Sequence, residues 1–316
     1  MVDGKKQWKA WLYLSPVIIL TLVFTVYPIV NTLRMAFSND YKLMEEVGGA
    51  TFSFGIENFT KVIKYQGFLT CLGNTMFLTV VTVPISTMLA LLIAVCLNSI
   101  KPLNRLLQTI YFLPYVTNTI AIGLVFSTMF SMVGVSIGTE NEIIATAGII
   151  NNIIEAFGGT RVNWVNAGSS WGANMFVMVV YIVWNALPFK ILILLGGLQS
   201  VNKQYYDAAK VDGTSRARTF WRITVPMLSP MLAYVIITGF IGGFKEYSSI
   251  VGVFGDNMGP AGKDGQLNTM VGYINTNIMS SNAHEGKASA AALILFVIIF
   301  AVTMLNMYVG KKRVHY

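Results

Sequence analysis

Residues 201–226 form a short, basic stretch between two long apolar segments. It contains eight consecutive residues with a regular pattern, Tyr206, Asp207, Ala208, Ala209, Lys210, Val211, Asp212 and Gly213, and then the cations Arg216, Arg218 and Arg222. The stretch is too short to be a domain of its own and too patterned to be filler. We interpret it as a docking segment that the protein presents to a partner.

The residue types in this stretch predict a short helix, a glycine turn and a second helix. Residues 205–211 contain helix-forming alanines and an acid early in the helix. Gly213 follows Asp212, at a position where a left-handed backbone is expected. Pro226 and Pro230 are tolerated in the first turn of a helix, so the second helix is expected to enter the next apolar segment.

Motifs for nucleotide binding and for hydrolysis are missing from the sequence. No G-x-x-x-x-G-K-[ST] phosphate loop occurs, and neither Gly262-Lys263 nor Gly286-Lys287 belongs to one. No H-E-x-x-H, G-x-S-x-G or selectivity-filter sequence occurs either. We therefore expect no enzyme and no bound cofactor, and an ATP-driven function would need ATP and Mg on a separate ATPase.

The composition predicts a membrane protein. Of the 316 residues, 54% are hydrophobic and 11% are charged, whereas soluble domains are about one quarter charged. The net charge of +8 then reflects cytoplasmic loops rather than nucleic-acid binding. Cys71 and Cys96 lie in or beside apolar runs, and His284 and His315 are far apart, so we expect no metal site.

Six stretches free of Asp, Glu, Lys and Arg are long enough to cross about 30 Å of hydrocarbon, and each predicts one transmembrane helix. They cover residues 10–33, 65–100, 106–139, 162–189, 223–244 and 288–310. The first lacks a small-residue cleavage site after a short apolar core, which favours a retained helix over a signal peptide. Residues 143–154 are apolar over about half the required length and predict an outer-loop helix.

The placement of basic residues predicts the orientation. One set of loops and ends carries Lys5, Lys6, Lys9, Lys101, Arg105, Lys203, Lys210, Arg216, Arg218, Arg222, Lys311, Lys312 and Arg313. The other loops, near 38–73, 132–170 and 247–287, include the acids Glu45, Glu46, Glu140, Glu142 and Glu155. Because short basic loops stay in the cytoplasm, both termini are expected inside and the three long loops outside.

Prolines and asparagines inside the predicted spans have two interpretations that the sequence leaves open. Pro84, Pro114 and Pro188 either break helices that line a pathway or are simply tolerated in transmembrane helices. The asparagines Asn118, Asn185 and Asn306 either join helices or face the pathway. No Asp, Glu, Lys or Arg falls clearly at mid-membrane, which argues against a proton-coupled transporter.

The basic stretch resembles the EAA loop of ATP-binding-cassette (ABC) importer permeases. The resemblance rests on residues 206–214 (YDAAKVDGT), followed by Phe220, Ile223 and Pro226. Further segments resemble the carbohydrate-uptake, maltose-type branch over nearly the whole chain: 74–75 (NT), 111–114 (YFLP), 148–151 (GIIN), 198–200 (LQS) and 288–292 (ASAAA). Asp207 replaces the usual Glu and Thr214 the usual Ala.

The resemblance implies an all-α membrane protein with six transmembrane helices, in which residues 1–316 form one permease domain and half of a pathway. Residues 207–213 would be a coupling helix that docks in a cleft of a cytoplasmic ATPase dimer and transmits its closure to the spans. The implied partners are that ATPase, a second permease subunit and an extracytoplasmic solute-binding protein. The implied location is the bacterial or archaeal cell membrane.

For a carbohydrate pathway, aromatic faces and neutral hydrogen-bonding groups are expected, and five residues provide them: Trp184, Asn185, Tyr234, Thr238 and Tyr247. Trp184 and Asn185 precede Pro188, where a helix break would expose them to a cavity. Alternatively these residues pack between helices or lie in the interfacial belt. Lys245 and Glu246 either pair with neighbours or contact the binding protein.

Other functions stay open. The same architecture would suit a non-sugar solute such as a glycerol phosphodiester or an amino acid. A stand-alone channel or secondary carrier belongs to a different class, and flux without ATP would distinguish it.

Overall fold

A computed structural model describes residues 7–100, 104–132, 134–137, 143–146, 148–280 and 283–313. Six residues used above for topology or metal arguments lie outside the described residues: Lys5, Lys6, Lys101, Glu140, Glu142 and His315. The chain divides into two compact units, a first one of Met1–Phe68 with Tyr273–Phe296 and a second one of Leu69–Gly272 with Val297–Tyr316. A single permease domain over residues 1–316 therefore stays a prediction.

The first unit combines the N-terminal helices with a polar loop region and two segments from near the C-terminus. Its elements are α1 (Gln7–Thr21), the π-helical turn η2 (Leu22–Val26), α2 (Tyr27–Ala36), α3 (Leu43–Val47), α4 (Glu57–Lys64), the end of α15 (Met270–Met279) and the start of α16 (Glu285–Arg313). Two hydrogen bonds join the early loop to α16. The Gly286 N–H donates to the Tyr41 carbonyl over 3.1 Å, and the Leu43 N–H donates to Glu285 Oε2 over 3.1 Å.

A polar cluster lies at the end of α2 in the first unit. Arg34 donates to Glu46 Oε1 over 2.6 Å and to Glu46 Oε2 over 3.2 Å, and the Tyr41 hydroxyl donates to the same carboxylate. Hydrogen bonds from Arg34 first and Tyr41 second favour the charged carboxylate, and they lower the pKa of Glu46 to about 2.

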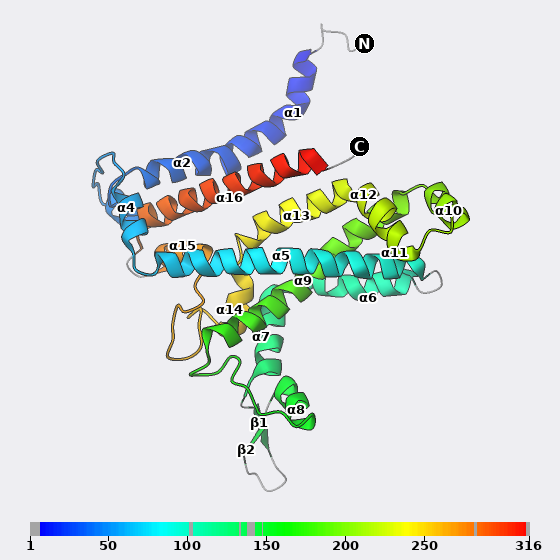
Figure 1. The fold of residues 1–316 in the computed structure, drawn as a ribbon. Helices are drawn as coiled ribbons and strands as arrows, with labels where there is room; N and C mark the ends of the chain where they lie inside the picture. Colours follow the sequence, from blue (N-terminus) through cyan, green and yellow to red (C-terminus); the bar gives the residue numbers. More distant parts are fainter. Residues whose placement is uncertain are drawn as a thin grey trace. The chain divides into compact units, whose positions relative to one another are not determined.

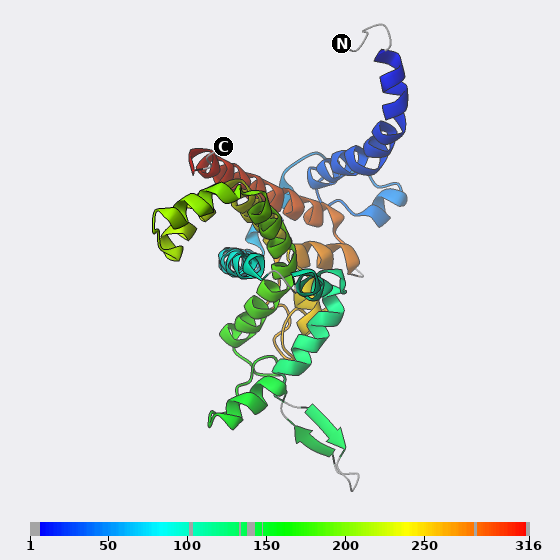
Figure 2. The ribbon, with the colours of Figure 1, turned by 90° about the vertical axis from the view of Figure 1, so that its right-hand side faces the viewer.

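The second unit contains most of the chain (Figures 1 and 2). Its elements are α5 (Phe68–Ser99), α6 (Asn104–Val116), α7 (Thr119–Phe130), β1 (Gly134–Ile137), β2 (Ile143–Thr146), α8 (Ile149–Ala156), α9 (Trp171–Ser200), α10 (Lys203–Val211), α11 (Arg216–Thr219), the π-helical turn η3 (Phe220–Thr224), α12 (Val225–Met227), α13 (Ser229–Gly243) and α14 (Ser248–Phe254), with the start of α15 and the end of α16. The two strands pair antiparallel, with Gly134 opposite Thr146.

Two hydrophobic cores hold the second unit together, and α9 contributes to both. One core joins α7, α9 and α14 and includes Phe126, Tyr181 and Ile250. The other joins α5, α9 and α13 and includes Leu194 and residues of both partner helices. The first half of α9 packs into one core and its second half packs into the other, so α9 connects the two cores.

Four helices among the described residues are long and apolar enough to cross a membrane: Trp8–Ala36, Phe68–Ser99, Trp171–Ser200 and Glu285–Gly310. A fifth candidate consists of Arg216–Met227 and Ser229–Gly243, which are bent by 68° relative to each other. The helical membrane fold is thus confirmed apart from the small β1–β2 ribbon. The number of six spans and the position of the termini stay predictions.

The predicted span 106–139 is wrong as a single helix. It is divided between α6 and α7, which are 13 and 12 residues long, and 12 residues of α-helix extend over only about 18 Å. The break lies at Asn118, whose side chain caps α7 by accepting from the N–H groups of Ile120 (2.8 Å) and Ala121 (3.3 Å). Asn118 is therefore a helix cap.

The outer-loop helix predicted over residues 143–154 is also corrected. Ile143–Thr146 is strand β2, and the helix begins only at Ile149 and ends at Ala156. Alternation and helical periodicity are difficult to separate in a short apolar run, which explains the error.

Prolines affect the helices in a way that the sequence did not predict. α5 continues through Pro84 and α9 through Pro188, so neither helix is broken there. The π-helical turns η2 and η3 instead end two residues before Pro28 and Pro226. A proline supplies no N–H to the preceding turn, and the wider turn is one way to accommodate that loss.

Candidate functional site

The basic stretch folds into a short helix with defined ends. Asn202 caps α10 by accepting from the Gln204 N–H over 3.0 Å. At the other end Gly213 has φ +65°. The Gly213 N–H donates to the Lys210 carbonyl over 3.1 Å, and the Thr214 N–H donates to the Ala209 carbonyl over 2.9 Å. These two bonds form a Schellman motif, so the predicted glycine turn is confirmed.

Some side chains of α10 pack against the rest of the protein, and others are exposed. Ala209 is buried, and the Tyr206 hydroxyl lies 3.3 Å from the Thr224 hydroxyl on η3. On the outer side Val211 is 88% exposed and Tyr205 is 51% exposed. Both side chains are therefore accessible to another chain.

Asp207 pairs within its own helix in this structure. Lys210 Nζ lies 3.1 Å from Asp207 Oδ1, and both side chains are largely exposed. An exposed pair of this kind contributes little to stability, so both charges are accessible to a partner.

A second, strongly bent helical segment connects α10 to the apolar part of the unit. Ser215 caps α11, and Arg216 and Arg218 lie in that short helix. η3, α12 and α13 follow, with the bend at Leu228. Phe220 packs against the α5–α9–α13 core, which anchors the segment. Figure 1 shows α10 and α11 at the end of the second unit where α5 and α9 both end.

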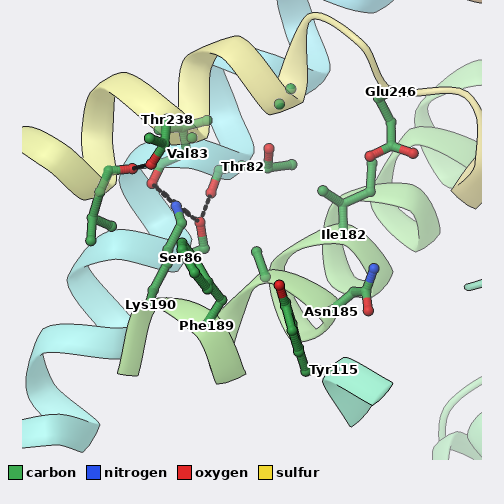
Figure 3. Close-up of a pocket in the computed structure, with 15 residues that line it drawn as sticks. Thr82, Val83, Ser86, Tyr115, Ile182, Asn185, Phe189, Lys190, Thr238 and Glu246 are labelled. Carbon is green, nitrogen blue, oxygen red and sulfur yellow. Dashed lines mark hydrogen bonds between the residues drawn. The ribbon is translucent and has the colours of Figure 1, made fainter. Parts of the chain in front are cut away.

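A pocket of about 310 Å³ lies between α5, α6, α9 and α13. It is lined by residues of α5, α9 and α13, by one residue of α6 and by one residue after α13: Thr82, Val83, Ser86, Tyr115, Ile182, Asn185, Ala186, Phe189, Lys190, Val235, Thr238, Gly239, Gly242, Gly243 and Glu246. Figure 3 shows that these residues enclose one space. Hydroxyl groups, an amide and aromatic rings therefore face a common cavity beside the candidate membrane spans.

Of the five predicted pathway residues, two line the pocket and three do not. Asn185 and Thr238 line the pocket. Trp184 packs against Phe126, with 5.5 Å between ring centroids, and Tyr247 packs against the same core. Tyr234 is 47% exposed and does not line the pocket. Of the two interpretations of Pro188, the structure shows the one without a helix break, so Asn185 reaches the pocket from an unbroken helix.

Lys190 is a pocket residue that the sequence argument missed. The predicted span ended at Phe189 because it was defined by the absence of charge, but α9 continues to Ser200 and carries Lys190 inside. The residue is only 5% exposed. Its Nζ donates to Ser86 Oγ (2.7 Å), Thr87 Oγ1 (3.0 Å) and the Val83 carbonyl (3.3 Å). The candidate span Trp171–Ser200 therefore contains a lysine that the charge-free stretch 162–189 left out.

Glu246, left undecided by the sequence, also lines the pocket. Its Oε1 accepts from the N–H groups of Tyr247 (3.2 Å) and Ser249 (3.1 Å), at the start of α14. The carboxylate thus satisfies the first turn of α14, where N–H groups lack partners within the helix.

Metal ligands do not gather in the described part of the chain. No group of three or more His, Cys, Asp or Glu residues there is arranged to hold a metal ion. Both cysteines are free, one buried and one exposed.

Comparison with known proteins gives matches along nearly the whole chain. The model of the family described as "Binding-protein-dependent transport system inner membrane component" matches residues 76–315. The arabinooligosaccharides transport system permease protein AraP of Halalkalibacterium halodurans is 32% identical over 300 residues, covering 94% of this chain and 86% of that protein. AraP of Bacillus subtilis is 29% identical over 304 residues, covering 96% and 88%.

Solved structures share the fold, and one of them is a bacterial alginate ABC transporter in complex with an alginate pentasaccharide-bound periplasmic protein. The matched chain is 20% identical with a TM-score of 0.77, and the match covers 98% of this chain and 96% of that one.

Proposed function

We propose a function for this chain on the premise that it belongs to the family of binding-protein-dependent transport system inner membrane components. A member of this family is a multi-pass inner-membrane permease of an ABC importer, and it is a transport subunit rather than an enzyme. The solute that we propose is an oligosaccharide or a related sugar. The AraP relatives support this class, and so do the hydroxyl, amide and aromatic groups of the pocket.

Residues 201–226 are the proposed coupling loop to a cytoplasmic ATPase dimer, which would carry ATP and Mg. The observation that supports this role is the capped helix α10, which ends in the Schellman turn at Gly213 and exposes Val211. Asp207, Asp212, Arg216 and Arg218 would meet polar groups of the ATPase. Closure of the ATPase dimer would move α10, and the packing of Phe220 would pass this movement to α5, α9 and α13.

The chain would form half of the translocation pathway and pair with a second permease subunit. An extracytoplasmic solute-binding protein would deliver the solute, as the family description and the periplasmic protein of the alginate transporter suggest. A non-sugar solute such as a glycerol phosphodiester or an amino acid is the alternative, and it is less favoured because the relatives cited above transport sugars.

The coupling role is tested by co-purification of the ATPase with the permease from detergent. Gly213→Trp is expected to lower ATPase recovery by about tenfold or more, because the ring projects from the turn that ends α10. Gly49→Trp is the matched control, since both glycines have positive φ (+65° and +91°) and open space at the Cβ position. Equal ATPase recovery with both variants would contradict the role of the loop.

A further inference from the structure

Lys190 places a buried positive charge at the pocket. The residue lies inside α9, a candidate membrane span, and it is wedged between α5 and α13. Gly239 on α13 leaves room beside the ammonium group, since a Cβ atom at that position would lie 3.3 Å from Lys190 Nζ. Figure 3 shows the Lys190 side chain directed toward the pocket wall formed by Val83 and Ser86.

All three hydrogen-bond partners of Lys190 are neutral oxygens: two hydroxyls and one carbonyl. Among the described residues Lys190 forms no ion pair. An ammonium ion that is removed from water carries a large desolvation penalty unless an opposite charge is near. The hydrogen bonds satisfy its donors, but they leave the ammonium charge without an ion-pair partner.

Glu246 contributes a carboxylate to the same pocket, and this carboxylate has hydrogen-bond partners of its own. Figure 3 shows it on the opposite side of the pocket from Lys190. Its Oε1 accepts the two backbone N–H groups at the start of α14. The carboxylate is therefore stabilised locally by the first turn of α14, and it does not neutralise Lys190 by direct contact.

We propose that Lys190 makes the pocket selective for an anionic, polyhydroxylated solute, namely a saccharide that carries a carboxylate. The anionic oxygen would supply the opposite charge at Lys190. Asn185, Thr238 and Tyr115 line the same pocket and suit the hydroxyl groups of such a solute. This inference rests on the proposed transport function and specifies its substrate class. A sugar phosphate shares the anionic chemistry and is distinguished by experiment.

The test measures saccharide binding to the assembled permease and ATPase in lipid nanodiscs, without ATP and without the binding protein, which has its own selectivity. Equilibrium dialysis compares radiolabelled trigalacturonate, its neutral methyl ester of the same length, and a phosphorylated disaccharide. The wild-type complex is expected to bind trigalacturonate at least about tenfold more tightly than the ester, the scale of one charge-assisted contact away from water. Tightest binding of the sugar phosphate would overturn the carboxylate assignment.

Lys190→Gln is the main variant, because it removes the charge while its amide can still donate to the hydroxyls of α5. It is expected to abolish the preference for the acid, whereas Lys190→Arg keeps it. Lys64→Met, an exposed lysine on α4, is the control and leaves the preference unchanged. Glu246→Gln is expected to maintain or raise the preference.

Two results would overturn the inference, and each is independent of the transport assignment. One is equal binding of the acid and the ester by the wild-type complex. This result can be obtained even if the variants fail to fold. The other is an unchanged preference in Lys190→Gln. ATP-driven uptake of the neutral ester in proteoliposomes reports the proposed function separately, so failure of transport and failure of selectivity are distinguishable.

Discussion

Asp207 and Lys190 are two charged residues that differ in burial and in ion pairing. Asp207 is exposed and pairs with Lys210 one turn later, so its charge costs little and is accessible. Lys190 is buried and forms no ion pair among the described residues. The first suits docking to a protein, and the second suits recognition of a charged solute.

Asp207→Asn is expected to separate docking from folding. Loss of an exposed helical ion pair should change the free energy of unfolding by less than about 0.5 kcal/mol. If Asp207 meets the ATPase, the same variant should reduce ATP-driven uptake severalfold. Lys210→Met breaks the same pair from the other side and serves as the matched control. Equal reductions of uptake in both variants would indicate that uptake depends on the Asp207–Lys210 ion pair, and they would contradict a direct contact of Asp207 with the ATPase.

Glu46 gives a pH-dependence in the first unit. Its pKa is lowered from the ordinary 4.5 to about 2, chiefly by the hydrogen bonds from Arg34. A lowered pKa in the folded state means that the stabilisation is complete above the ordinary pKa and is lost as the pH falls toward 2. Hydrogen exchange near α3, corrected for intrinsic rates, should therefore increase only below about pH 4.5. Glu46→Gln should exchange faster at neutral pH and lack this pH-dependence.

At the residue scale the sequence predicted local turns better than buried charges. Gly213 was identifiable because a glycine after a helical run predicts the left-handed turn that the structure contains. Lys190 could not be identified as a buried residue, because a rule that ends each span at the first charged residue places every lysine outside the spans. For Trp184 and Tyr247 the sequence left the pathway and packing between helices open, and both residues pack against a core that only the tertiary structure defines.

At the scale of elements, α7 and α14 cross at two glycines. A Cβ atom on Gly123 would lie 2.5 Å from the Gly252 backbone, and one on Gly252 would lie 3.0 Å from the Gly123 Cα atom. Such close approach of two backbones is how small residues pack membrane helices. The crossing holds α14 in place, and the first turn of α14 binds Glu246 at the pocket.

Gly123→Ala is expected to destabilise the protein by about 1–3 kcal/mol, because the added methyl group meets backbone that must shift. Gly73→Ala is the control: it lies on α5 with no atom near its Cβ position, and alanine favours helix. Thermal unfolding in detergent should show a lower midpoint for Gly123→Ala and an equal or higher one for Gly73→Ala. Equal midpoints would contradict the close crossing.

Helix ends were harder to predict than helix identity. Hydropathy identified α5, α9 and α16, because each contains a long apolar run, but α9 covers Trp171–Ser200 rather than residues 162–189. It joined α6 and α7 because the stretch between them is free of charge, although the Asn118 cap begins a new helix there. The unbroken course of α9 through Pro188 depends on tertiary packing around both of its cores, which the sequence does not contain.

At the scale of the whole molecule, the two proposed functional regions lie in the same unit. The proposed coupling loop follows the end of α9, and the middle of α9 lines the pocket. The α5–α9–α13 core connects them, since Phe220 packs on one side and Val235 lines the pocket. A movement of α10 therefore has a packed route to the pocket.

If this chain is a permease subunit of an ABC importer, it transports only when a partner hydrolyses ATP. The most direct measurement is uptake of labelled oligosaccharide into proteoliposomes that contain the permease with or without its ATPase, second permease subunit and binding protein. We expect uptake by the complete assembly that stops when ATP is omitted, and none by this chain alone. ATP-independent flux through the chain alone would contradict the account and indicate a channel or secondary carrier.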